Sequence, residues 1–477
     1  MVFSSPVFLF LFLPLVLLFT LLAGRRSAQN SVLLVASLIF YWWGEGVYTL
    51  LMLGVILFNH LCGVAIERTA SRRAVLTLAV VMNVGALAWF KYASFLADAI
   101  GGVLGGLGLP PLVLDPVHLP IGVSFFIFHS LSYVIDVYRG DARAQTQPGI
   151  TALYITLFPQ LVAGPIIRYH DVATQFTQRV MALPLFASGV QRFVVGLAKK
   201  VLIADQCARI ADPIFGLDMG EVTTSVAWLG IVAYALQIYF DFSGYSDMAI
   251  GLGRMFGFQF LENFDRPYIA RSIREFWQRW HISLSRWFRD YLYIPLGGNR
   301  SGLVRTYLNL YIVFFLTGLW HGASWSFVVW GLVHGTFMVV ERIGLDKLLE
   351  RAPRLVGNAY MLLVVLVAWA FFRVEDITGA WRYISAMFGV HRGVVELCYP
   401  ELFLTNSTLL ALCLGMLGAL NLHVVIWRAM RLPPMRRDDV PWGAWGLARS
   451  AGTALLLVLV GMAVASSTYS PFIYFRF

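Results

Sequence analysis

Long apolar stretches, separated by short polar segments, run along the whole of this chain. They lie near residues 6–23, 31–43, 47–66, 74–90, 118–138, 186–204, 224–240, 304–320, 323–340, 355–372, 403–427 and 450–467. A helix of about 20 apolar residues crosses the roughly 30 Å hydrocarbon core of a bilayer. Some stretches are shorter or are bounded by Gly and Pro, which predicts re-entrant helices among the complete spans. The pattern therefore predicts an all-α polytopic membrane protein.

Composition supports this class. Of the 477 residues, 59% are hydrophobic and 13% are charged, and the mean hydropathy is +0.72. A soluble domain has about 25% charged residues. Because the sequence contains no internal repeat of fixed period and no low-complexity linker, we expect residues 1–477 to form a single integral-membrane domain.

The first apolar stretch is followed, not preceded, by basic residues. A cleaved signal peptide has a basic segment before its apolar region, whereas Arg25 and Arg26 come after it. The positive-inside rule therefore predicts an N-terminus that faces outward and places Arg25 in the cytoplasm. The next basic segment, 67–73, fits this alternation. We attribute the net charge of +10 mostly to topology, and nucleic-acid binding is not expected.

The four cysteines and the common catalytic motifs add little. Cys62, Cys207, Cys398 and Cys413 are isolated from one another, which is typical of small buried hydrophobic residues rather than of metal ligands or disulfides. The motifs HExxH, GxxxxGK[ST] and GxSxG are absent, which argues against a zinc peptidase, a P-loop protein and an α/β-hydrolase. No metal site is predicted.

Arginine and aromatic residues are concentrated in the segment 263–300, NFDRPYIARSIREFWQRWHISLSRWFRDYLYIPLGGNR. On a continuous helix over 271–291, the apolar side chains fall within one arc of about 120°. These side chains are Ile273, Phe276, Trp277, Trp280, Leu284, Trp287, Phe288 and Tyr291. The other side is taken by Arg271, Arg274, Gln278, Arg286 and Arg289. This is the pattern of a helix in the membrane interface with its basic face toward the cytoplasm, and His281 projects at the border of the two faces.

Two explanations of these arginines stay open. One is membrane topology together with contact to lipid phosphates. The other is an anionic, phosphate-bearing ligand that approaches from the cytoplasm, because guanidinium groups bind phosphate in a bidentate manner.

Polar residues also interrupt the apolar stretch before this segment. Asp241, Ser243, Ser246 and Asp247 occur within QIYFDFSGYSDMAIGLGRMFGFQF. A charge at membrane depth costs roughly 3 kcal/mol on insertion scales, so such residues face protein or water. Pairing with an arginine of the following segment and direct contact with a ligand are both consistent with this position.

The histidines of the apolar stretches divide into two groups. A lone intramembrane histidine usually makes an interhelical hydrogen bond, and we assign His60, His129 and His334 to this group. On a continuous helix, His334 would lie on a different face from His321. His321 is flanked by Gly318 and Gly322 in GLWHGASW, and these glycines allow other backbone to come close. We therefore interpret His321 as the candidate for a general base in a water-poor site.

Several motifs together resemble the membrane-bound O-acyltransferase (MBOAT) family, in particular its branch of bacterial integral-membrane alginate O-acetyltransferases. They are the opening MVFSSPVFLFLFLPL, FPQLVAGPIIRY (158–169), GLAKKVLIAD (196–205), IYFDFSGYSDMAIGLGRMFGF (238–258), the segment 263–300 and LTGLWHGASW (316–325). The specific motifs lie within about 151–342, and 343–477 is expected to add further transmembrane helices.

The resemblance implies a ring of about 10–13 tilted transmembrane and re-entrant helices around a thinned central tunnel, with interfacial amphipathic helices. It implies that His321 matches the invariant family histidine and that His281 matches the second one, so both are expected to be catalytic. The residues of these motifs that we assign to substrate binding are Asp241, Ser243, Asn263, Arg266, Gln278, Arg279, Trp280, Arg286, Trp320 and Trp325.

The resemblance further implies an acyl thioester, acetyl-CoA or another, as a donor substrate from the cytoplasm, with no permanently bound cofactor. The acceptor is expected outside the bacterial inner membrane. This acceptor is expected to be an extracytoplasmic acetyltransferase or acceptor protein of the exopolysaccharide machinery. The polymer that is finally acetylated is expected to be alginate. Membrane lipids surround the protein, and its N-terminus is periplasmic. Neutral imidazole can deprotonate a hydroxyl near neutral pH. We expect His321 to act as this base and His281 to position the donor or relay a proton.

Two alternatives remain from the sequence. One is an acyltransferase with another acceptor, such as cellulose, peptidoglycan, teichoic acid or a lipid. The other is a transporter of a polysaccharide or lipid-linked sugar without acyl chemistry, which also needs many spans, buried polar groups and basic loops.

Overall fold

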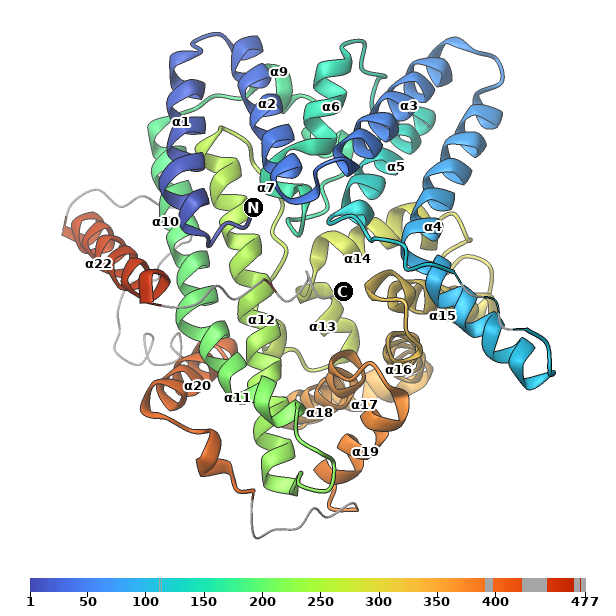
Figure 1. The fold of residues 1–477 in the computed structure, drawn as a ribbon, viewed down its shortest axis with the longest axis vertical. Coiled ribbons are helices and arrows are strands. Elements are labelled where there is room, and N and C mark those ends of the chain that lie inside the picture. Colours follow the sequence, from blue (N-terminus) through green and yellow to red (C-terminus); the bar gives the residue numbers. More distant parts are fainter. Residues whose placement is uncertain (111, 113, 391–397, 423–443, 467–471, 473–477) are drawn as a thin grey trace. The chain divides into compact units, whose positions relative to one another are not determined.

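The computed structural model describes the chain except for residues 111, 113, 391–397, 423–443, 467–471 and 473–477. Helices make up 77% of the described residues, and none of these residues lies in a strand. The helices are labelled in Figure 1. The prediction of an all-α protein is confirmed.

The described residues divide into two compact units. Unit 1 comprises residues 1–190 and 249–261, and unit 2 comprises residues 191–248 and 262–477. The chain passes from one unit to the other within α10 (Leu183–Ala198), within α12 (Thr224–Met255) and again between Leu261 and Glu262. The expectation of a single integral-membrane domain stays a prediction, and each unit is described by itself.

Unit 1 contains most of the N-terminal helices. They are η1 (Phe8–Phe12), α1 (Leu13–Leu22), α2 (Arg26–Glu45), α3 (Tyr48–Arg68), α4 (Arg72–Gly106), α5 (Val123–Arg139), α6 (Pro148–Thr156), α7 (Phe158–Leu161), α8 (Tyr169–Val172) and α9 (Gln175–Gln178). Helix α5 is buried almost all round, as expected for a helix at the centre of its unit. Gly63 of α3 lies directly against the ring of Tyr133 of α5, where a larger residue would collide.

Unit 2 contains the second half of the chain and the segments that the sequence singles out. After α10 it continues through η2 (Lys199–Ala204), α11 (Asp205–Phe215), α12, η3 (Pro267–Ile269), α13 (Ile273–Arg279), α14 (Ile282–Phe288), η4 (Arg289–Tyr293), α15 (Leu303–His321) and α16 (Trp325–Val340). The remaining elements are η5 (Glu341–Leu345), α17 (Asp346–Arg351), α18 (Arg354–Arg373), α19 (Ile377–Met387), η6 (Pro400–Phe403), α20 (Asn406–Ala419) and α22 (Ala444–Ser466).

Seven helices of the described part are long and apolar enough to cross a membrane. They are Tyr48–Arg68, Arg72–Gly106, Thr224–Met255, Leu303–His321, Trp325–Arg351, Arg354–Arg373 and Gly446–Ser466. Each overlaps a predicted apolar stretch, so the polytopic character is confirmed. The stretches 6–23 and 403–427 form shorter apolar helices, Phe8–Leu22 and Asn406–Ala419, and residues 423–427 lie outside the described part. The ring around a tunnel stays a prediction.

The prediction of one continuous interfacial helix over 271–291 is wrong. The chain forms α13, then a break at Trp280 and His281, then α14 and η4. Ser272 caps the start of α13, and its Oγ accepts a hydrogen bond from Glu275 N at 3.0 Å. The break occurs because His281 has left-handed backbone angles, φ 44° and ψ 53°, which no α-helix can contain.

The apolar arc of this segment is buried in protein. All eight of its side chains belong to the buried class, from Ile273 at 0% exposure to Tyr291 at 9%. Packing within unit 2, rather than contact with lipid, therefore explains the helical spacing of the apolar residues.

The apolar stretches on either side of His321 form a tight pair of helices, α15 and α16. Gly318 of α15 lies directly on the backbone of Phe327, and Gly331 of α16 lies on the backbone carbonyl of Phe314. The close approach that we predicted for Gly318 is confirmed, whereas Gly322 meets the ring of Phe327. Since α15 ends at His321 and α16 begins at Trp325, the continuous helix from which we separated His321 and His334 does not exist.

Candidate active site

His281 occupies the turn between α13 and α14. Positive φ is uncommon for a residue other than glycine, and this turn is held by two backbone hydrogen bonds to the segment before α13. Ile282 N donates to Asn263 O at 2.9 Å, and Asp265 N donates to Arg279 O at 2.9 Å. A strained conformation of this kind persists only where the surroundings determine it, and such residues cluster at functional sites.

The imidazole of His281 is fully buried, with 0% exposure. The ring of Phe242 of α12 stands edge-on to it at a centroid distance of 4.7 Å, and the ring of Trp320 lies at 6.0 Å. Its Nδ1 lies 3.1 Å from Asn263 Oδ1. Burial lowers the pKa of His281 to about 3, because an apolar surrounding disfavours the charged form. The ring is therefore a neutral imidazole at neutral pH.

His321 is the last residue of α15 and is 4% exposed. Three aromatic rings surround it, Trp320, Trp330 and Phe372, at centroid distances of 4.7, 4.8 and 5.1 Å. Trp320 contacts both His321 and His281. One side chain, Trp320, therefore contacts both predicted catalytic histidines.

His334 departs from the hydrogen-bonding role that we predicted. Its side chain is fully buried, and neither ring nitrogen has a hydrogen-bond partner among the described residues. It packs against Trp330 at 5.0 Å and Trp277 at 5.2 Å. His334 and His321 therefore share contact with Trp330. The prediction is confirmed for His60, whose Nδ1 lies 3.0 Å from Thr151 Oγ1 on another helix of unit 1.

The carboxylates of α12 pair with cations of the preceding segment, not with an arginine of the following one as we considered. Lys200 Nζ lies 2.7 Å from Asp241 Oδ1 and 2.7 Å from Asp205 Oδ1. Asp247 pairs with Arg192 at 2.7 Å and with Lys199 at 2.6 Å. These pairs compensate the burial of charge and let α12 continue to Met255, well past the predicted end at residue 240.

The other predicted substrate-binding residues lie in different environments. Asn263 and Trp280 are 1% exposed, Ser243 is 2% exposed, and Trp320 is 5% exposed. Trp280 packs among the rings of Phe264 and Trp369 at 5.0 and 5.1 Å, so it forms part of the core. Ser243 Oγ has no hydrogen-bond partner within the described ranges. Trp325, at the start of α16, is 56% exposed.

The polar side chains of the arginine-rich segment are more accessible. Arg266 pairs with Asp265 at 3.0 Å, and Arg279 pairs with Glu275 at 2.9 Å. Gln278 is exposed and Arg286 is half-buried. The partners of Arg266 and Arg279 are acidic side chains rather than either histidine. The assignment of these residues to substrate binding stays a prediction.

Sequence reasoning missed several aromatic residues that enclose the histidines. They are Phe242, Trp330 and Phe372, which contact one or the other imidazole, and Phe472, which packs on Phe242 and Tyr245 at 6.2 and 4.6 Å. In the sequence these residues look like any other apolar residue of a span. Only their packing distinguishes them.

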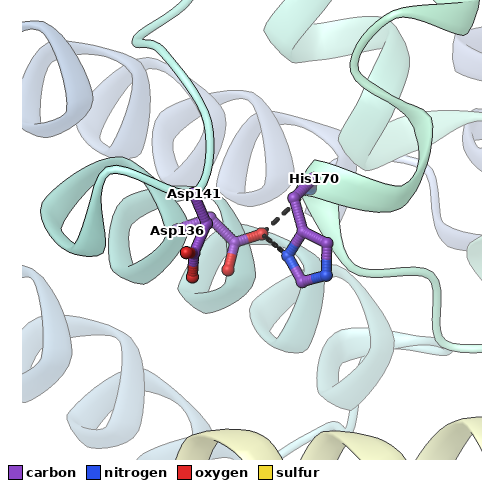
Figure 2. Close-up of side chains that lie close together, drawn as sticks. All are labelled: Asp136, Asp141 and His170. Carbon is purple, nitrogen blue, oxygen red and sulfur yellow. Dashed lines mark hydrogen bonds and ion pairs between the residues drawn. The ribbon is translucent and has the colours of Figure 1, made fainter.

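A second polar cluster, in unit 1, has the residue types of a metal site. Single ligand atoms of Asp136, Asp141 and His170 lie within 4.8 Å of one another, and Figure 2 shows Asp136 facing His170. The backbone N and the Nδ1 of His170 both lie 2.9 Å from Asp136 Oδ2. These hydrogen bonds account for the contact between Asp136 and His170. No motif or spacing in the sequence singles out these residues.

The cysteines have no partners of their own kind in the structure. Cys62, Cys207, Cys398 and Cys413 are all free thiols. The first three are buried and Cys413 is exposed. The prediction of small buried residues is confirmed for Cys62, Cys207 and Cys398 and is wrong for Cys413.

Comparison with known proteins agrees with the apolar helices. The model of the MBOAT, membrane-bound O-acyltransferase family matches residues 73–372. The chain belongs to the membrane-bound O-acyltransferase family. The match reaches past residue 345, where the motifs in the sequence end.

Named relatives extend this similarity over the full chain. A probable alginate O-acetylase AlgI of Azotobacter vinelandii is 41% identical, and one of Pseudomonas putida is 44% identical, each with 100% of both chains covered. A peptidoglycan O-acetyltransferase of Helicobacter pylori is 35% identical over 84% of this chain and 81% of its own. This protein is therefore a membrane-bound acyltransferase, which decides against a transporter without acyl chemistry.

Proposed function

We propose that this acyltransferase transfers an acetyl group from a cytoplasmic thioester, acetyl-CoA, across the bacterial inner membrane to an extracytoplasmic acceptor, and that this leads to O-acetylation of alginate. The single observation that carries the proposal is the pair of buried imidazoles, His281 and His321, joined through Trp320. The similarity to two alginate O-acetylases over their full length supports the choice of acetyl group and polymer.

The chemistry follows from the residues around His321. An acceptor hydroxyl attacks the thioester carbonyl, so that a C–O bond forms and the C–S bond breaks, and the sulfur leaves as the thiol with the proton that His321 took from the hydroxyl. His321 takes the hydroxyl proton, a contribution worth roughly 10²–10⁴ in rate. The aromatic wall of Trp320, Trp330 and Phe372 excludes bulk water and so protects the thioester from hydrolysis. His281 positions the donor or relays a proton.

The partners follow from the same scheme. The donor comes from the cytoplasm, and the acetyl group passes to an extracytoplasmic acetyltransferase or acceptor protein of the exopolysaccharide machinery. The N-terminus lies in the periplasm, as the basic residues Arg25 and Arg26 after the first apolar helix suggest. The similarity to a peptidoglycan O-acetyltransferase makes peptidoglycan the second candidate acceptor.

Transfer across inside-out vesicles tests this function. The protein is expressed with its extracytoplasmic partner, labelled acetyl-CoA is added outside the vesicles, and label on the lumenal acceptor is measured. We expect His321→Ala to lower the transfer rate by roughly 10²–10⁴. His60→Gln is the matched control, because His60 is a hydrogen-bonded histidine of unit 1 and its replacement should leave the rate per folded molecule unchanged.

Two outcomes would contradict the proposal. Undiminished transfer by His321→Ala would remove the assigned base. Label on peptidoglycan rather than on alginate, in cells that make both, would replace the polymer but keep the acetyltransferase.

A further inference from the structure

The orientation of the Asn263 amide is determined by a backbone donor. Ser283 N donates to Asn263 Oδ1 at 3.2 Å, and Ser283 Oγ donates to the same atom at 2.8 Å. On the other side, Asn263 Nδ2 donates to Ser246 Oγ at 2.9 Å. A backbone N–H can only donate. The atom that it meets must therefore be the amide oxygen, and this removes the usual ambiguity between the two ends of an asparagine side chain.

This oxygen decides which nitrogen of His281 carries the proton. His281 Nδ1 lies 3.1 Å from Asn263 Oδ1, and an amide oxygen accepts hydrogen bonds but cannot donate them. Nδ1 must therefore carry the hydrogen. Because the neutral imidazole has one N–H, its Nε2 then has a lone pair that can accept a hydrogen bond.

The Nε2 atom has no partner of its own. It is buried and makes no hydrogen bond to any of the described residues. The side chains that face the ring, Phe242 of α12 and Trp320 of α15, are not ionisable. A buried acceptor without a partner is unfavourable, which is the situation expected where a ligand supplies the missing donor.

We propose that Asn263 is a positioning residue, which holds His281 in the Nδ1–H tautomer so that Nε2 accepts a hydrogen bond or a proton from an O–H or N–H group of a substrate. The role of His281 in transfer rests on the function proposed above. Asn263, which we assigned to substrate binding from the sequence, acts through His281 instead, since both ends of its amide are occupied within the protein. The low pKa of His281 agrees with this, because the ring stays neutral and available as an acceptor.

The tautomer of His281 can be determined without an assay of acetyl transfer. We would label the histidines with nitrogen-15, reconstitute the full-length protein in lipid nanodiscs, and assign the His281 signals by their loss in His281→Gln. The wild type should show a protonated Nδ1 and an unprotonated Nε2. Asn263→Leu, which has a similar volume but no acceptor, should lose this preference. A protonated Nε2 in the wild type would overturn the proposal.

Kinetics distinguish positioning from simple support of the fold. We expect Asn263→Leu to lower kcat for acetyl transfer by about 10²-fold, the lower end of what an acid–base group contributes, with little change in KM. The matched control is Asn309→Leu. Asn309 is also fully buried, and its Nδ2 donates to Leu296 O and Gly298 O at 3.2 and 3.0 Å. That variant should be less stable, but its kcat per folded molecule should be unchanged.

Asn263→Asp provides a rescue that only the tautomer explains. The carboxylate keeps the accepting oxygen but adds a negative charge, which favours the imidazolium form and raises the pKa of His281. Its activity should therefore be low at acid pH and recover as pH rises. The His281 ring contacts Phe242, Trp320 and Asn263, and the titratable group reached through Trp320 is His321. The same tautomer measurement in the His321→Ala background therefore controls for the titration of His321.

The outcomes separate this proposal from the function on which it rests. If Asn263→Leu has the expected tautomer change but transfers acetyl groups like the wild type, positioning is wrong and acetyl transfer stands. If the wild type transfers no acetyl group, the proposed function fails, and the nitrogen-15 signals still decide whether Asn263 sets the tautomer. Should Asn263→Leu not fold, the wild-type signals and Asn263→Asp decide.

Discussion

His281 in unit 2 and His170 in unit 1 each have Nδ1 beside a side-chain oxygen, but they differ in the surroundings of Nε2. In each, Nδ1 faces a side-chain oxygen, from Asn263 at 3.1 Å and from Asp136 at 2.9 Å. His170 also has Asp171 Oδ1 at 3.4 Å from its Nε2, and its side chain is 29% exposed. His281 is fully buried, and no described residue meets its Nε2.

The difference supports the role proposed for His281 and a structural role for His170. Both nitrogens of His170 lie near a carboxylate oxygen, and the Nδ1 contact with the buried carboxylate of Asp136 is charge-assisted, so the ring joins α5 to α8 as a structural link. His281 has one nitrogen held and the other available. An aromatic ring with one anchored nitrogen is oriented as a positioned acid–base group must be, whereas an imidazole with two internal partners is not free to react.

Alanine substitution at the two histidines gives the largest expected contrast. His281→Ala should lower acetyl transfer by roughly 10²–10⁴, because it removes the available nitrogen, while His170→Ala should leave the rate per folded molecule unchanged. The measurement is transfer from labelled acetyl-CoA in vesicles with equal amounts of folded protein. A wild-type rate for His281→Ala together with a lost rate for His170→Ala would invert the comparison. If His321→Ala alone keeps activity, the roles of His281 and His321 are reversed.

Removal of the acceptor in unit 1 should change stability rather than activity. Asp136→Ala leaves the backbone N–H and Nδ1 of His170 without their shared acceptor. We expect a loss of about 1–3 kcal/mol in the free energy of unfolding and a lower melting temperature in detergent, with transfer per folded molecule retained. Ser132→Ala, which removes a local hydrogen bond to Phe128 O within α5, controls for general damage to the helix. Equal melting temperatures for Asp136→Ala and the wild type would refute the structural role.

Acid should destabilise the wild type in part through His281. The pKa of this ring falls from 6.5 in the unfolded chain to about 3 in the folded protein. Because the unfolded state binds the extra proton between these values, stability present above pH 6.5 is lost as pH falls toward 3. His281→Gln, which cannot titrate, should lose less of its melting temperature between pH 7 and pH 4. Parallel losses for both proteins would show that His281 is not buried as a neutral ring.

Chelation should have the smallest effect. In the cluster of Asp136, Asp141 and His170 (Figure 2), hydrogen bonds join Asp136 directly to His170. We therefore expect EDTA to leave both the melting temperature and acetyl transfer unchanged, as measured on protein purified without chelator. A fall in melting temperature that Zn²⁺ or Mn²⁺ restores, and that Asp141→Asn abolishes, would instead establish a cation at this cluster.

Much of the fold and part of the site follow from local patterns. Apolar stretches of helix length predict spans because hydropathy and helix rise are properties of neighbouring residues, and His321 is conspicuous because a polar ring inside such a stretch needs compensation. The same reasoning failed at 271–291. There the helical periodicity is present, yet a hydrogen bond from Ile282 N to Asn263 O and the left-handed angles of His281 divide the segment.

The sequence by itself determined the class of the protein and most of its spans, and it identified the two candidate histidines. Hydropathy and motifs are properties of short segments, so they can be recognised without the structure. Only the tertiary structure decided what each histidine can do. The Asn263 contact joins residues that are 18 positions apart, and Trp320 meets His281 from another helix. Such contacts depend on how helices pack, and no periodicity in the chain records them.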